Sequence, residues 1–462
     1  MRRMHTPMLL APLLATLLLG APLASPAGGE PARLLRIVLW TSEIHADRLA
    51  GIRYLADVFA ATHPGVEVRV ESVDENKLHE RTLRAVEEGD PPDLVNTGAQ
   101  LLTSLGKRGV LDPGEATRAI ERIGGERFYS GALRRLAVPG GKGYYAVPLH
   151  GWVQGIWYRA DWFEEAGLAP PSTWAAIRTA AHRFTDPARG TYGILLGTGG
   201  TSYSEQIFTQ LALSNGADMF DSRGEPDFNT PAMAETLELY VELAGCTPKG
   251  PQTWRARDYY LQGRAAMLFY STFIMDDLAL EGAAEDSLGQ GHFPDLPGAP
   301  FDPELARNTR LAPLITHARS AGYGVVNGLG VVRGSSREKR EAVRSLLDFL
   351  YSPAAYVEWV HLAPGGMLPV LRDVAASDAF MRDPLGVFRR YGRPKMREIL
   401  SGLERMADFG QNGRADGTLA AEIYARAIIP RMIRMATQEG VAVPQALAWA
   451  HGEMRRVAAE NR

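Results

Sequence analysis

The chain has 462 residues, of which 45% are hydrophobic and 22% are charged. It is therefore too apolar for a disordered chain and long enough for two or three domains. The 50 Lys and Arg residues against 53 Asp and Glu residues give a formal net charge of −3, which offers no overall electrostatic reason to bind nucleic acid. The one cysteine, Cys246, excludes an intramolecular disulfide framework and a zinc site built on several thiolates.

Residues 1–27 have the pattern of an export signal peptide. A positively charged start precedes the uncharged apolar run Met8–Leu19, and the small residues Ala24 and Ala27 offer cleavage positions. The apolar run is short for a membrane span, and no cysteine follows it that could carry the lipid of a lipoprotein. We expect the signal peptide to be cleaved and the mature chain to reside in a bacterial periplasm; an uncleaved anchor is the alternative.

The first part of the mature chain alternates between strand and helix patterns. The runs Leu35–Trp40, Val66–Val70 and Asp93–Val95 predict strands, since short apolar or alternating runs are typical of buried or half-buried strands. Helical patterns over about 49–59 and 76–88 separate them. This order predicts a parallel sheet with helices on both faces, which is a doubly wound α/β layer.

The pattern changes after the extended stretch Tyr144–Pro148. A second set of elements follows, with a strand at Gly155–Tyr158, a helix after Trp174 and a strand at Tyr192–Leu196. We therefore expect a second α/β lobe to begin near residue 146.

The later part of the chain begins with a surface excursion and ends in helices. Residues 284–310 are rich in Gly, Pro, Asp and Asn, which predicts the excursion. A return to strand is expected at 325–332. Ser335 and Glu338 have the spacing of a capping box, which predicts a helix that continues through Leu350. The C-terminal residues beyond it are predicted to be helical.

Seven motifs occur in a fixed order along the mature chain: Phe59 with Pro64 and Val66, Pro92–Val95, Gly109 with Leu111, Trp157–Leu168 followed by Trp174, Gly263–Met267, Ser352–Ala354, and Gly366–Pro369. Together they resemble the motifs of the extracellular solute-binding proteins of the maltose-binding-like family, the periplasmic receptors of ATP-driven sugar importers. The chain departs from the family pattern at Arg159, where Asn is usual, and at Ser271, Phe273 and Asn327, which replace a tryptophan motif and a glycine pair. The identity of the ligand therefore does not carry over from the resemblance.

The resemblance implies two doubly wound α/β lobes joined by hinge strands, as in type II periplasmic binding proteins. The N-terminal lobe would comprise residues 32–145 and 326–372, and the C-terminal lobe residues 146–325 and 373–462. The ligand would lie in the cleft at the carboxyl ends of strands, where such sheets place their sites. The resemblance also implies a monomer that interacts with the permease subunits of an ABC transporter, with no enzyme activity and no cofactor.

A neutral sugar presents apolar ring faces and hydroxyl edges, so its receptor needs aromatic rings and polar side chains. Such residues follow predicted strands or the hinge, and the ligand-binding candidates are Trp40, Glu43, Asn96, Gln100, His150, Trp152, Tyr203, Tyr270, Phe273, Asn327, Gly366 and Arg372. Structural roles are the alternatives for several of them: Trp40 as a core residue, Glu43 as a helix cap, and His150 as a hydrogen-bonding hinge residue. Gln154 lies in the same hinge stretch as His150 and Trp152.

Three functions are compatible with these observations. The first is a binding protein for a di- or oligosaccharide. The second is a receptor for a polyol, a glycerol-phosphate compound or another polar metabolite; a phosphate needs convergent basic residues, of which only Arg372 and Lys77 are candidates. The third is a secreted carbohydrate-active enzyme, but the chain has neither a Gly-x-Ser-x-Gly nor a His-Glu-x-x-His motif. We expect the first, with no metal.

Overall fold

The computed structural model describes residues 34–410 and 417–460, so the predicted signal peptide, residues 1–27, lies outside the described residues. From Leu35 onward the chain is one unit by its contacts, and everything below concerns that unit. In its described part no helix is both long enough and apolar enough to cross a membrane.

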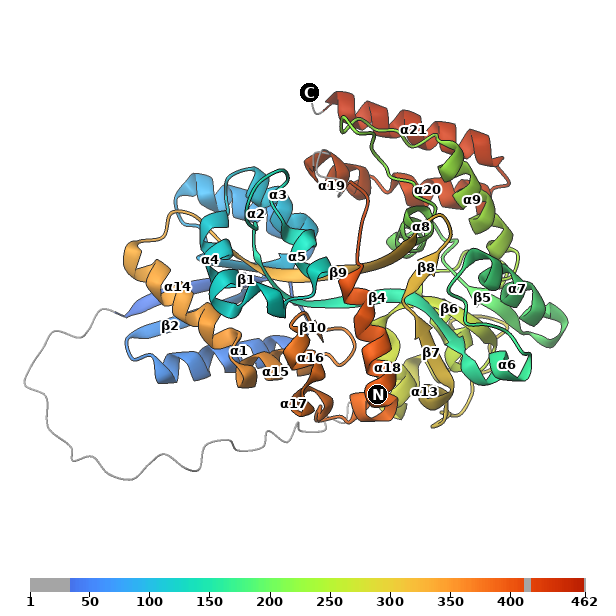
Figure 1. The fold of residues 1–462 in the computed structure, drawn as a ribbon, viewed down its shortest axis with the longest axis horizontal. Helices are drawn as coiled ribbons and strands as arrows, with labels where there is room; N and C mark the ends of the chain where they lie inside the picture. The colour runs from blue at the N-terminus through green and yellow to red at the C-terminus, as the bar shows by residue number, and fades with distance from the viewer. Residues whose placement is uncertain (1–33, 411–416, 461–462) are drawn as a thin grey trace, which may run out of the picture. The chain divides into compact units, whose positions relative to one another are not determined.

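The strands join in one mixed sheet whose main path runs β2-β1-β3-β9-β4-β6-β5 (Figure 1). Their bounds are β1 Leu35–Thr41, β2 Val66–Ser72, β3 Leu94–Gly98, β4 Val147–Arg159, β5 Tyr192–Leu195, β6 Ala265–Ser271, β7 Thr309–Ala312, β8 Leu314–Thr316, β9 Ser320–Val331 and β10 Leu368–Pro369. β1 pairs in parallel with β2 and β3, as the alternating pattern of strands and helices predicts.

Helices flank both ends of this path. The first group is α1 Ala46–Thr62, α2 Glu75–Glu88, α3 Ala99–Lys107, α4 Pro113–Ile123, α5 Ser130–Leu136, α6 Ala160–Glu165, α7 Trp174–Phe184, α8 Ser202–Ser214, α9 Pro231–Ala244 and α10 Arg257–Leu261. The second group is α11 Met275–Ala279, α12 Glu281–Leu288, α13 Leu305–Asn308, α14 Arg337–Leu350, α15 Pro353–His361, α16 Arg372–Ala376, α17 Asp378–Met381, α18 Val387–Ser401, α19 Gly417–Ala425, α20 Ile428–Thr437 and α21 Val443–Glu460.

The long strands β4 and β9 connect two halves of the sheet. β9 pairs with β3 at one end, β4 pairs with β6 at the other, and the two pair with each other in antiparallel register between them. Figure 1 shows α1–α5 and α14 around β1 and β2, which we call the β1 half, and α6–α9 around β5 and β6, which we call the β6 half. The division into lobes at 145/146 and 325/326 stays a prediction, and its second boundary falls inside β9.

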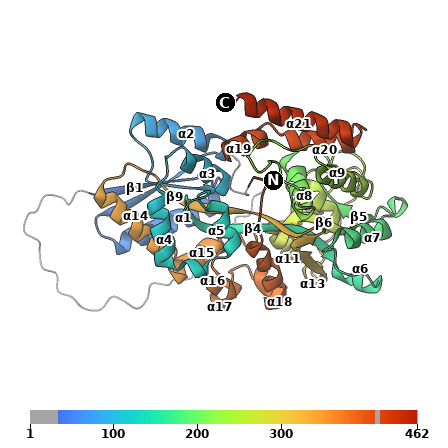
Figure 2. The same ribbon diagram turned by 45° about the horizontal axis from the view of Figure 1, so that its top comes forward.

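Segments from the two halves also meet beyond the hinge strands. α19, which packs with α20 and α21 on the β6 half, lies against α3 of the β1 half (Figure 2). The halves are therefore in contact on the side where α2, α3 and α19 gather.

The capping box predicted at Ser335 is wrong by one residue. Ser336 is the N-cap of α14, and its hydroxyl accepts a hydrogen bond from the Lys339 backbone amide at 3.3 Å. Ser335 instead donates its hydroxyl to Asp93 at 2.7 Å. Asp93 also accepts from the Val38 amide of β1 at 2.9 Å, so this carboxylate ties the start of α14 to the sheet. A spacing pattern alone does not distinguish two adjacent serines, because both can form such bonds.

Two tryptophans of the family-like motif lie in the core. Trp157 on β4 and Trp174 at the start of α7 are at most 2% exposed, so they are packing residues. Their indole N–H groups donate to the Tyr270 carbonyl at 3.2 Å and to the Ser214 hydroxyl at 2.9 Å, since a buried indole needs an acceptor.

Candidate functional site

One face of the hinge strands reaches solvent. Residues directly opposite each other on antiparallel strands share a face, and Trp152 of β4 lies opposite Val325 of β9. Both are half-buried, as is Ser271 at the end of β6. The other face is closed, with Val153 fully buried against the turn that follows α18. We call the open side the Trp152 face.

Three aromatic rings line the Trp152 face. The Trp152 ring centroid lies 6.5 Å from that of Phe273 and 6.1 Å from that of Tyr323, with interplanar angles of 66° and 57°. Phe273 follows β6 in the short turn Thr272–Ile274. The Gly366 backbone packs so closely against the Phe273 ring that a Cβ atom at this position would overlap the ring. Two predicted residues that are 121 positions apart in the sequence, Trp152 on β4 and Phe273 after β6, are thereby brought together.

Glu43 and Arg48 extend this face from the β1 half. The Arg48 guanidinium lies 5.7 Å from the centroid of the Phe273 ring and 3.6 Å from the Glu43 carboxylate. One Glu43 oxygen also accepts from the amides of Ile44 and His45, at 3.0 and 2.9 Å, just before α1. These bonds hold the turn ahead of α1, whose N-cap is His45, so Glu43 is not itself the helix cap that was the structural alternative for it.

The buried His150 and the half-buried Asn327 lie opposite each other on β4 and β9. The indole N–H of Trp359 donates to His150 Nδ1 at 3.1 Å, and Asn327 lies 3.1 Å from His150 Nε2. A neutral ring whose Nδ1 accepts carries its proton on Nε2. The Asn327 atom placed at Nε2 is Nδ2, so a hydrogen bond here requires the amide oxygen and nitrogen to exchange places. Burial, together with the nearby Arg48 charge, lowers the pKa of His150 to about 3.

Replacing His150 by glutamine should reduce the loss of stability at acid pH. The folded pKa of about 3 lies below the ordinary value of 6.5, so below pH 6.5 the unfolded chain binds a proton that the folded chain does not. The folded state then loses roughly 1.4 kcal/mol per pH unit until His150 itself titrates. Between pH 7 and pH 5, urea unfolding should show a decrease about 2 kcal/mol larger for the wild type than for His150→Gln. Equal decreases would contradict this assignment, and the exposed His45→Gln serves as the control.

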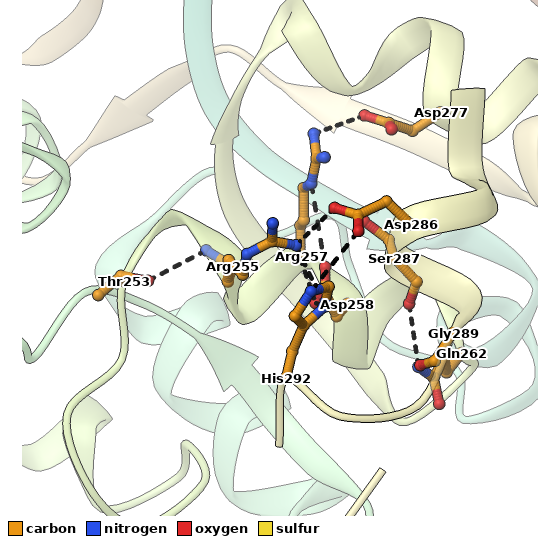
Figure 3. A network of polar contacts seen from close by, with 10 residues as sticks. All are labelled: Thr253, Arg255, Arg257, Asp258, Gln262, Asp277, Asp286, Ser287, Gly289 and His292. Carbon is orange, nitrogen blue, oxygen red and sulfur yellow. Dashed lines mark hydrogen bonds and ion pairs between the residues drawn. The ribbon is translucent and has the colours of Figure 1, made fainter. Parts of the chain in front are cut away.

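A network of charged groups supports the segment that carries Phe273 (Figure 3). Arg257 on α10 donates to Asp277 on α11 at 2.8 Å, and His292 lies 2.9 Å from Asp258. Burial raises the pKa of Asp277 to about 7 even with this arginine beside it. Because α11 directly follows the turn that contains Phe273, the Arg257–Asp277 pair anchors this segment to α10.

Other predicted residues lie away from the three rings. Trp40 is 6% exposed and packs under Arg81 of α2, with the guanidinium 4.2 Å from its ring centroid. The Asn96 side chain accepts from Thr41 and donates to the Gly328 carbonyl, at 2.9 and 3.0 Å, so it joins β1, β3 and β9.

Tyr203 and Tyr270 pack against each other under β6, with ring centroids 5.9 Å apart, and the Tyr203 hydroxyl donates to the Phe269 carbonyl at 2.6 Å. Arg372 pairs with Glu404 at 2.7 Å and lies over the Tyr129 ring. In the described part of the chain no hydrogen bond, ion pair or ring contact links these residues to Trp152, and their roles as ligand contacts stay predictions.

Gln100 belongs to a contact between distant segments. Its side-chain amide donates to Asp408 at 3.0 Å, and the same carboxylate accepts from Arg135 of α5 at 2.9 Å. Arg48 and Tyr323 are residues of the site that the sequence reasoning missed. Arg48 lies five residues after the candidate Glu43, at the start of a predicted helix, and this position could have indicated it as a candidate. Tyr323 lies outside the predicted strand at 325–332, so no sequence pattern indicated it.

The sheet order, the two long connecting strands and the aromatic residues at their centre are those of a periplasmic-binding-protein fold. The protein belongs to the family of bacterial extracellular solute-binding proteins, whose sequence model matches residues 43–357. Members of this family are transporter binding proteins, so the expected absence of enzyme activity is confirmed by family membership.

Three similar proteins illustrate the relationship. The putative ABC transporter periplasmic-binding protein YcjN of Escherichia coli is 26% identical over 92% of this chain and 93% of its own length. The mannitol-binding protein of Pseudomonas aeruginosa is 28% identical over 48% of this chain and 50% of its own length. The structure of maltose-bound MalE3 of T. maritima superimposes with a TM-score of 0.66 at 18% identity, covering 92% of this chain and all of that one. The last comparison establishes the fold, and the expected family and fold class are confirmed.

Proposed function

We propose that this protein captures an uncharged carbohydrate on the Trp152 face and delivers it to the permease subunits of an ABC importer. The observation that carries the proposal is the half-buried indole of Trp152, flanked by the rings of Phe273 and Tyr323. Aromatic faces of this kind match the apolar faces of sugar rings. The comparison with a maltose-bound structure supports the same class of ligand.

An uncharged ligand is favoured over a phosphate because Arg48 at the Trp152 face, and also Arg135 and Arg372, are already paired with carboxylates. Arg48 lies 3.6 Å from Glu43, Arg135 lies 2.9 Å from Asp408, and Arg372 lies 2.7 Å from Glu404. A guanidinium group that already contacts a carboxylate gains less from a phosphate than an unpaired one would.

We propose that binding closes two lobes, residues 32–145 plus 326–372 and residues 146–325 plus 373–462, about β4 and β9. Contacts from both halves to one ligand would stabilise the closed state over the open one. Arg48 of the β1 half already contacts Phe273 of the β6 half, which places groups from both halves at one point. The protein would act as a monomer in the periplasm after removal of residues 1–27.

The second candidate ligand is a polyol, and the relative named as a mannitol-binding protein favours it. Calorimetric titration with maltose, a longer maltodextrin, mannitol and ribitol distinguishes the two candidates. We expect micromolar or tighter binding of a di- or oligosaccharide, accompanied by a smaller radius of gyration in solution scattering. Tight binding of a polyol alone would select the second candidate. Binding without compaction would contradict the closure mechanism, and binding of glycerol phosphate alone would contradict the proposal of an uncharged ligand.

A further inference from the structure

The side chain of Gln154 is buried without a hydrogen-bond partner. Gln154 lies in the middle of β4 and is 1% exposed. Neither its amide oxygen nor its amide nitrogen has a partner within residues 34–410 and 417–460. Leaving a buried polar group unsatisfied costs about 1–3 kcal/mol, and an apolar residue of the same length would fill this place at no such cost.

The position of Gln154 places the amide beside the aromatic rings. It is two residues from Trp152 on the same strand, so both side chains lie on the Trp152 face. In the sheet register Gln154 lies directly opposite Tyr323 on β9 and opposite Ser271 on β6. Three polar side chains therefore form a row across three adjacent strands next to the indole, and the Cβ atoms of directly opposite residues are about 5 Å apart.

The chemistry of an amide suits two neighbouring hydroxyl groups. Its oxygen accepts one hydrogen bond while its NH2 group donates another, and each hydroxyl of a vicinal diol can both donate and accept. A charged ligand group would instead favour a residue of opposite charge at this place.

We propose that Gln154 is a specificity-determining ligand contact whose amide binds a vicinal diol of the carbohydrate or polyol that lies against Trp152. The inference rests on the function proposed above, and it explains why a polar side chain with no protein partner occupies the centre of the sheet. A site that hydrogen-bonds a hydroxyl rejects analogues that lack it, because the buried polar group is then left without a partner.

The test compares wild type with Gln154→Leu, titrated with maltose, mannitol, ribitol and tagatose. The ligand-free variant should unfold at the same temperature as the wild type or higher, because an unsatisfied amide has been removed. Its affinity for the best of the four probes should fall at least tenfold. The longer, unbranched Gln154→Met repeats the measurement if the leucine variant does not fold.

Gln210→Met is the matched control. Gln210 on α8 is also fully buried, but its amide nitrogen donates a hydrogen bond to the Pro313 carbonyl at 3.0 Å. This variant should lose thermal stability and keep the affinity of the wild type. The two glutamines are thus expected to show opposite effects on stability and on binding.

Monodeoxy derivatives of the best probe identify the contact directly. At least one should bind the wild type tenfold or more weakly than the parent and bind Gln154→Leu as well as the parent does, since the two changes remove the same interaction. If Gln154→Leu is destabilised and retains wild-type affinity, the amide has a structural role and the inference is overturned, while Trp152→Ala still tests the proposed function. A wild-type protein that binds none of the four probes overturns the proposed function and this inference with it.

Discussion

Trp152→Ala is expected to weaken carbohydrate binding at least 30-fold while leaving the protein folded. The half-buried indole is the central one of the three rings on the Trp152 face. Loss of an aromatic contact surface of this size costs on the order of 2 kcal/mol of binding free energy. This cost corresponds to an increase of Kd by a factor of about 30. Isothermal titration measures the affinity, and circular dichroism at increasing temperature monitors folding. Trp152→Phe should retain part of the affinity, because a smaller ring still offers an apolar face.

Trp449→Ala is the matched control for this variant. Trp449 is also half-buried, but it lies on α21, away from the hinge strands. The Trp449→Ala variant should bind the ligand with the same affinity as the wild type. Unchanged binding in Trp152→Ala, or an equal decrease in both variants, would contradict the assignment of the Trp152 face as the ligand site.

Asp408→Ala is expected to cause a large loss of stability. Its carboxylate pairs at 2.9 Å with Arg135, whose side chain is 2% exposed, and it also accepts from Gln100. Removing one partner of a buried ion pair leaves the other charge uncompensated and costs about 3–5 kcal/mol. Urea unfolding followed by circular dichroism should show a decrease of this size.

The double variant Arg135→Met with Asp408→Leu separates the effect of the pair from that of packing. Removing both charges leaves no buried ion without a partner, so most of the lost stability should return. A double variant as unstable as the single one would show that other contacts of this segment account for the loss. The free energy of unfolding of Asp408→Ala could also decrease by less than about 1 kcal/mol. If the radius of gyration of this variant is then larger than that of the wild type, Arg135 becomes hydrated when the two halves move apart.

The local elements were predictable because each depends on neighbouring residues in the chain. The strands at 35–40, 66–70 and 93–95 and the helices between them have clear periodicities. The predicted surface excursion at 284–310 is only partly right, since α12 extends into it and Leu296 and Leu305 are buried. Glycine and proline content indicates breaks in regular structure, and it does not indicate what later packs over them.

The candidate site was predictable only in part. Phe273 follows a predicted strand, Trp152 follows the predicted hinge, and the structure brings the two rings together. Tyr270 is the neighbour of Ser271, but it lies opposite Gly155 and not opposite Gln154. Since successive side chains of a strand point to opposite faces, a difference of one residue decides whether an aromatic ring faces the ligand or the core. Pairing register, which the sequence does not reveal, makes that decision.

The amino-acid sequence by itself determined the family, the α/β class and the order of the elements, because these depend on periodicity and on short motifs that neighbouring residues carry. Tertiary structure alone decided that Tyr323 meets Trp152, that Arg48 meets Phe273, that Arg372 is paired with Glu404, and that the Gln154 amide is buried without a partner in the described part of the chain. Each of these depends on contacts between segments far apart in the chain, and such contacts follow from how strands pair and helices pack.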